Sequence, residues 1–419
     1  MMHAIEARPR EHNPTSAFVA AVVGYVALLS AAAVLNSGLL RALSYAAAFI
    51  IFLMMLVIMG FLPKKQQVKA YFGPALTLYY LGLTCSIAVN SDQLAFADLL
   101  KLYMGPAFLL FGWAFEAQRE RYLWEKLAVR QAFWCMALLP LAVGALQVVT
   151  GALHGGVGVR EAMIGGGGEF SIFTNRNNAA LYAVAMLAFY NVLTGKPVRN
   201  IFVILVTGAA FATLGVLAAV VVALSLTVLK WNTLKYAIPL FLIFALGYFI
   251  FPDSIVFKRV KPVVDSIQLL YSGRIDLNNV TFGQLVLLLQ TQDLSFLFRL
   301  KHWLNLWTIY TDGAWYHWLF GYGVGASVSM SQIHLVPHND YLRFLFECGV
   351  VTFLGFVSTI VLIVGACGRR WETVPLLAIS LYFFSENLVN NYLAMALFYF
   401  CAGALTYRTR TQYVDIQPP

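Results

Sequence analysis

A short polar stretch in the second half of the chain carries side chains that could do chemistry. It reads Pro337-His338-Asn339-Asp340-Tyr341-Leu342 and stands directly before a long apolar run. Asn339 or Asp340 can cap a helix that begins there, and the positive end of a helix disfavours a charged imidazole at its start. A neutral histidine can accept a proton, so His338 is the candidate general base. The alternative is a histidine that only caps the helix or lies at a membrane interface.

Arg299 is the candidate partner for an anionic substrate. It lies in the apolar segment 293–310, where an unpaired guanidinium is costly, so we expect a carboxylate or a phosphate beside it. Asp293 and Asp276 are the candidate carboxylates. Arginine also binds phosphate and pyrophosphate through two parallel hydrogen bonds, which makes Arg299 and Arg274 candidates for such a ligand.

Metal and cofactor chemistry has no support in the sequence. There is no HExxH motif, no DxD-like motif and no second pair of carboxylates beside the candidate base. The five cysteines are an odd number, form no CxxC pair and lie in or beside apolar segments. We interpret them as small hydrophobic residues, and we expect neither a metal nor a cofactor.

The composition is that of a protein embedded in a membrane. Of the 419 residues, 60% are hydrophobic and 11% are charged, whereas soluble domains carry about 25% charged residues. The apolar runs rarely alternate as barrel strands do, so we expect an all-α polytopic protein in contact with membrane lipids. The basic residues behind the net charge of +9 lie in short loops, which is a topology signal and argues against a nucleic-acid partner. Residues 1–16 are polar, and no cleavable signal peptide is expected.

Apolar runs and basic loops together predict about twelve transmembrane helices with both termini in the cytoplasm. Lys64, Lys65 and Lys69 place the loop after the second span inside. The uncharged run 201–229 is ambiguous in length, and we interpret it as a hairpin with an outer turn near Thr213, because the later basic loops then fall inside. The other expected spans are 17–36, 43–62, 70–89, 99–114, 131–150, 179–193, 236–251, 350–366, 374–384 and 392–407.

The expected organisation has three parts. Residues 1–251 hold spans 1–9, residues 252–345 form one large helical periplasmic loop, and residues 346–419 hold spans 10–12 and a cytoplasmic tail. Such a long loop is typically functional, and its apolar tryptophan-containing segment is typical of a helix at the membrane interface. A twelve-span secondary transporter is the interpretation from another class. The halves show no internal repeat, and few charges lie within the spans, both of which weaken it.

Three motifs, in order along the chain, resemble those of the O-antigen ligase and O-antigen polymerase superfamily. The stretch from Pro337 to Leu342, followed by Glu347 and Gly349, is similar to the family signature. A second motif, similar to the family's asparagine motif, is Phe173-Thr174-Asn175-Arg176-Asn177-Asn178. A third is similar to the family's arginine–tryptophan and glycine segments, and consists of Phe298-Arg299 with Trp303 and Gly321-Tyr322-Gly323-Val324-Gly325. The resemblance covers about residues 170–355.

The resemblance implies a metal-independent, inverting glycosyltransferase of the GT-C type. Such an enzyme moves a glycan from an undecaprenyl-pyrophosphate donor to an acceptor hydroxyl at the periplasmic face of a bacterial inner membrane. By this resemblance His338 activates the acceptor hydroxyl, and Arg299 holds the donor pyrophosphate and stabilises its departure. The expected substrate-binding residues are Asn175, Arg176, Asn178, Arg274, Asn339 and Glu347.

The main alternatives within this superfamily are a ligase and a polymerase. A ligase transfers a finished glycan to lipid A-core, whereas an O-antigen or exopolysaccharide polymerase extends a growing glycan on its lipid carrier. A protein O-oligosaccharyltransferase is a related alternative. The single dominant outer loop favours the ligase. One departure concerns the hairpin turn, where the family usually carries an arginine and this chain reads Ala212-Thr213-Leu214-Gly215. Arg176, Arg274 or Arg160 are the candidates to supply that charge.

Overall fold

The computed structural model describes much of the helical bundle and most of residues 252–345, which we call the outer segment. The described residues are 14–35, 38–60, 65–92, 95–117, 125–150, 172–173, 176–195, 214–227, 242, 246, 250, 255–273, 276–277, 279–289, 295–368, 370–389 and 391–414. Several expectations fall outside them: the first arm of the hairpin, most of the ninth span, Asn175 and Arg274.

The described part of the chain contains helices and no strands, which confirms the all-α prediction. The first half holds α1 (Pro14–Leu35), α2 (Gly38–Gly60), α3 (Lys65–Val89), α4 (Phe96–Ala117), α5 (Leu127–Thr150), α7 (Arg176–Thr194) and α9 (Leu214–Thr227). The second half holds α11 (Ile255–Tyr271), α12 (Phe282–Leu289), α13 (Ser295–Thr311), α14 (Trp315–Phe320), α15 (Ala326–Ser329), α16 (Asp340–Cys367), α17 (Thr373–Tyr382) and α18 (Tyr392–Val414).

Three described segments are long and apolar enough to cross a membrane, and shorter apolar helices accompany them. The three are Tyr71–Val89, Leu127–Leu146 and Asp340–Cys367. Each lies on one of the expected spans, and the last begins ten residues earlier than expected. The chain is therefore a helical protein with three candidate membrane spans in its described part.

Helices α4 and α18 pack so closely that only glycine fits at their contact. A Cβ at Gly112 of α4 would overlap the backbone carbonyl of Phe400, and one at Gly403 of α18 would overlap that of Leu109. In a membrane, where apolar side chains gain little from leaving lipid, such small residues let two helices pack tightly. These two helices form the centre of a bundle whose buried apolar side chains make one large cluster.

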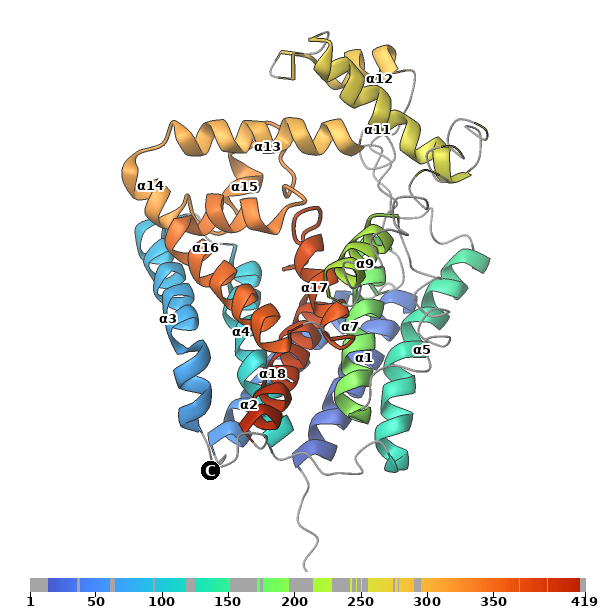
Figure 1. The fold of residues 1–419 in the computed structure, drawn as a ribbon, viewed down its shortest axis with the longest axis vertical. Coiled ribbons are helices and arrows are strands. Elements are labelled where there is room, and N and C mark those ends of the chain that lie inside the picture. The colour runs from blue at the N-terminus through green and yellow to red at the C-terminus, as the bar shows by residue number, and fades with distance from the viewer. Residues whose placement is uncertain are drawn as a thin grey trace, which may run out of the picture.

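The outer segment covers one end of this bundle. Helix α13 lies across that end, above α14, α15 and the start of α16, and α11 and α12 lie farther out (Figure 1). Two reciprocal hydrogen bonds of 2.8 Å join Tyr310 of α13 to Trp318 of α14 through their side chains and carbonyls. A small apolar core that includes Leu306, Tyr310, Ala326 and Phe346 fixes α13 on the helices below it.

Helix α16 is kinked at Gly349, which has a positive φ of 76°. The kink frees two carbonyls of the preceding turn, and the backbone N–H groups of Tyr322 and Gly323 donate to Phe346 and Glu347 at 3.0 and 2.9 Å. A Cβ at Gly349 would overlap the carbonyl of Leu319, so both the conformation and the space require glycine. The glycine segment noted in the sequence is therefore the strap that holds the broken turn of α16.

Candidate functional site

His338 is held in an uncommon conformation at the start of α16. Its φ is +50°, in the left-handed region, which costs a non-glycine residue about 1–2 kcal/mol. Asn339 follows in an extended conformation and caps the helix by accepting from the backbone N–H of Leu342 at 3.0 Å. On the other side, the indole N–H of Trp303 donates to the carbonyl of Pro337 at 2.6 Å. The expected helix cap is confirmed, and Asn339 provides it.

The imidazole of His338 contacts a carboxylate that sequence reasoning had not placed in the site. Its Nδ1 lies 2.9 Å from Oε1 of Glu386, which is in the connection between α17 and α18 and is buried. The other oxygen, Oε2, accepts from the side-chain amide of Asn177 at 2.5 Å. The site is therefore assembled from three distant segments, at the starts of α7 and α16 and after α17.

Glu386 is a stable anion in this environment. Burial by itself raises the pKa of Glu386, but the hydrogen bond with His338, the charges of His338 and Arg299 and the Asn177 amide together lower it to about 2. A carboxylate can only accept, so Nδ1 of His338 carries the hydrogen of the shared bond. In the neutral ring, Nε2 is then the nitrogen with the free lone pair, which is the tautomer that a general base needs.

Arg299 adds a positive charge to this site. It is half-buried, and within the described part of the chain it forms no hydrogen bond or ion pair. Its charge nevertheless reaches Glu386. Of its two expected partners, Asp293 lies outside the described residues, and Asp276 accepts from the amide of Asn279 at 2.6 Å. A half-buried guanidinium in this position has donors left for an anionic ligand.

His302 is a second histidine that sequence reasoning missed. It is fully buried, and neither ring nitrogen has a hydrogen-bond partner among the residues that the structure describes. Burial, followed by the charge of His338, lowers the pKa of His302 to about 4, so it is neutral at neutral pH. The spacing Arg299, His302 and Trp303 places all three on one face of α13, and this pattern was the available signal.

The remaining predicted site residues are less directly connected to His338. Arg176 is the first residue of α7, and its side chain is not among those described. Asn178 is buried, and its carbonyl accepts from the amide of Asn391 at 3.2 Å. Asn339 uses its side-chain oxygen as the helix cap. None of these contacts brings a predicted substrate-binding side chain onto the imidazole of His338.

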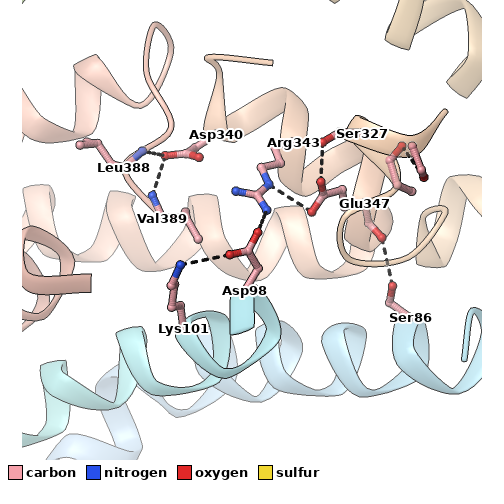
Figure 2. Close-up of polar contacts among 11 residues, drawn as sticks. Ser86, Asp98, Lys101, Ser327, Asp340, Arg343, Glu347, Leu388 and Val389 are labelled. Atoms are coloured by element: carbon pink, nitrogen blue, oxygen red, sulfur yellow. Dashed lines mark hydrogen bonds and ion pairs between the residues drawn. The ribbon is translucent and has the colours of Figure 1, made fainter. Parts of the chain in front are cut away.

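Glu347 lies in a buried ion-pair network and is not in contact with His338. Its carboxylate accepts from Nε of Arg343 at 3.1 Å and from the hydroxyl of Ser327 at 2.5 Å. Arg343 also donates to Asp98 of α4 at 2.8 Å, and Lys101 lies 3.2 Å from the same carboxylate (Figure 2). The described contacts of Glu347 therefore tie α16 to its neighbours, and the prediction that it binds substrate has no contact that supports it.

No protein-family model matches the chain, and no curated protein matches it either. The site and the fold therefore define the class. The chain is a helical protein with candidate membrane spans, in which a part-exposed histidine is paired with a buried carboxylate and an arginine lies nearby.

Proposed function

We propose that the chain is a membrane glycosyltransferase that moves a glycan from an undecaprenyl-pyrophosphate donor to an acceptor hydroxyl. The observation that carries the proposal is the hydrogen bond from His338 to the buried Glu386, with the charge of Arg299 beside it. A histidine oriented by a carboxylate is the arrangement with which enzymes deprotonate hydroxyl groups. The motif resemblance supplies the nature of the donor.

In the proposed mechanism Nε2 of His338 removes the proton of the acceptor hydroxyl. The acceptor oxygen then forms a bond to the anomeric carbon, while the bond from that carbon to the pyrophosphate oxygen breaks on the opposite side, so the configuration inverts. Glu386 keeps the ring oriented and stabilises the imidazolium that forms. The proton later leaves to solvent, which returns His338 to its neutral form.

Arg299 has the second role, at the leaving group. The bond that breaks leaves negative charge on the pyrophosphate, and a fixed guanidinium stabilises this charge as it develops. Asn175, Arg176, Asn178 and Arg274 complete the proposed donor site. Since the hairpin turn lacks the usual arginine of the family, Arg176, Arg274 or Arg160 is proposed to supply the second positive charge.

The proposed location is a bacterial inner membrane, with about twelve spans, both termini in the cytoplasm and the site facing the periplasm. The arrangement of α13, α14 and α15 across one end of the bundle supports an outer cap over the site (Figure 1). The favoured acceptor is lipid A-core, as for an O-antigen ligase. A growing glycan, as for an O-antigen or exopolysaccharide polymerase, is the second acceptor within this proposal.

One observation is shared with the transporter interpretation. Transporters carry paired charges within their spans, and Asp98, Arg343 and Glu347 form such a buried set. In this chain the Arg343–Asp98 pair joins α16 to α4, and Glu347 joins Arg343 to Ser327 of α15, so packing between helices explains the set. We therefore retain glycan transfer as the function.

The experiment replaces His338 with alanine in protein reconstituted into lipid vesicles. Donor is undecaprenyl-pyrophosphate-linked glycan, and acceptor is lipid A-core. We expect transfer to fall by a factor on the order of 10² to 10⁴, the range for loss of a general base. His334 is the matched control, because it also has a positive φ but is exposed on the same segment. Full transfer by His338→Ala, or an equal loss in His334→Ala, contradicts the proposal.

A further inference from the structure

The connection between α17 and α18 carries Glu386, and a buried neighbour of His338 holds that connection in place. Asp340 is the second residue after His338 and is fully buried. Its backbone N–H donates to the carbonyl of Phe383 at 2.7 Å. Its side-chain Oδ2 accepts from the backbone N–H groups of Leu388 and Val389 at 2.6 and 3.1 Å (Figure 2).

These hydrogen bonds hold the connection on both sides of Glu386. Phe383 precedes Glu386 by three residues, and Leu388 follows it by two. One residue therefore joins both flanks of Glu386 to the segment that carries His338. The distance of 2.9 Å between Nδ1 and the carboxylate is set across this link.

The side chain of Asp340 is not needed for the capping of its own helix. Asn339 already provides that cap for α16. The Oδ1 atom of Asp340 has no hydrogen-bond partner among the described residues, so its side-chain hydrogen bonds all go to the connection. Burying a carboxyl group away from water is costly unless it is hydrogen-bonded, and here the bonds that offset this cost are those to the connection.

We propose that Asp340 is a positioning residue that sets Glu386 against His338. This inference rests on the proposed function of that pair, and it adds a residue that acts through Glu386 and not on the substrate. Without the Oδ2 bonds the connection is free to shift, and the imidazole loses the carboxylate that fixes its tautomer. A misplacement of about 1 Å at such a contact costs on the order of 10²-fold in rate.

The first test compares two substitutions of Asp340 in the vesicle assay described above. Asp340→Ala removes the acceptor, and we expect kcat to fall on the order of 10²-fold with little change in the KM for the donor. Asp340→Asn keeps one oxygen that can accept from Leu388 and Val389, and should recover most of the loss. Tyr341→Phe is the control, because it removes another hydrogen bond between α16 and α17, to the carbonyl of Ser380, without removing a contact of Asp340 or Glu386. An Asp340→Asn variant as slow as Asp340→Ala overturns the proposal.

The second test is a double-mutant cycle with Glu386→Ala, which removes the acceptor of the His338 bond. If Asp340 acts through Glu386, then adding Asp340→Ala to Glu386→Ala lowers kcat no further. Losses that multiply show that Asp340 acts independently, and they overturn the proposal. Should Asp340→Ala fail to accumulate in the membrane, Asp340→Ser, whose shorter side chain does not reach Leu388, takes its place in the cycle.

A third measurement does not depend on activity. In protein labelled with ¹⁵N-histidine, the hydrogen-bonded Nδ1–H of His338 gives a resonance that the His338→Ala variant identifies by its loss. We expect this resonance to disappear in Asp340→Ala and in Glu386→Ala, which removes the acceptor, and to persist in Asp340→Asn. Persistence in Asp340→Ala overturns the positioning role. Full transfer by His338→Ala instead overturns the proposed function, so the two failures are distinguishable.

Discussion

At the scale of single residues, the histidines of the outer segment differ in their hydrogen-bond partners. His338 contacts a buried carboxylate, and His334 is exposed with Nδ1 near the carbonyl of Val328. His302 is buried, and neither of its nitrogens has a partner among the described residues. The sequence predicts a neutral His338 from its position at a helix start. That argument leaves out Glu386, the carboxylate to which the ring is hydrogen-bonded. Glu386 lies 48 residues away in sequence, and no local pattern signals that the connection returns to this point.

His302 gives a prediction about stability and pH. Its pKa is about 4 in the folded protein and 6.5 in an unfolded chain, so the unfolded state binds the proton first as the pH falls. The free energy of unfolding is therefore unaffected by this group above pH 6.5, and it falls by about 3 kcal/mol as the pH falls from 6.5 to 4. We expect His302→Leu to match or exceed the wild type in thermal midpoint at pH 7, since it removes two unpaired polar atoms.

The thermal midpoints of wild type and His302→Leu, measured in detergent between pH 7 and pH 4, check this prediction. The difference in favour of the variant should widen below pH 6.5. His334→Leu is the control, because the same substitution is made there at an exposed histidine of the same segment. A large loss of stability in His302→Leu at pH 7 would mean that the ring nitrogens have a partner that stabilises the fold.

At the scale of elements, the sequence predicts the start and the end of α16 but not the kink inside it. The apolar run and the capping residue predict a helix that starts after His338 and a span that ends near Cys367, and both features are present. The kink at Gly349 was not predicted, because it depends on the strap at Gly321–Gly323 that fills it from another part of the chain. Glycine in both segments was the visible signal, but its meaning required the contact.

Gly349 supplies the prediction that belongs to this element. Alanine at this position adds a Cβ that overlaps the carbonyl of Leu319 and forces a positive φ on a residue that disfavours it. We expect Gly349→Ala to lose about 1–3 kcal/mol of folding free energy, seen as a lower thermal midpoint. Gly365→Ala is the control on the same helix, where nothing lies within 4 Å of an added Cβ. Equal midpoints for the two variants would show that the kink is not required.

At the scale of the whole molecule, two ion pairs fasten the bundle. Arg408 of α18 donates through Nε and Nη2 to both oxygens of Glu116 of α4, at 2.8 and 2.9 Å. Arg343 of α16 donates to Asp98, near the other end of α4, at 2.8 Å. The hydrophobic pattern predicts the helices, but it does not predict which of them meet, since these pairs join residues 292 and 245 positions apart. Pairing at that range is set by packing, which the order of spans does not specify.

Topology is the property of the whole molecule on which the proposed site depends, because the proposed donor glycan lies at the periplasmic face. Ser272 follows α11 and Lys126 precedes α5, and both are exposed. With the native cysteines replaced, we expect Ser272→Cys to react with a membrane-impermeant thiol reagent in intact spheroplasts, and Lys126→Cys to react only after the membrane is opened. Basic loops are retained on the cytoplasmic side; Lys126 lies in such a loop, and Arg130 follows in the first turn of α5. Labelling in the reverse order would place His338 in the cytoplasm and remove the proposed donor from its reach.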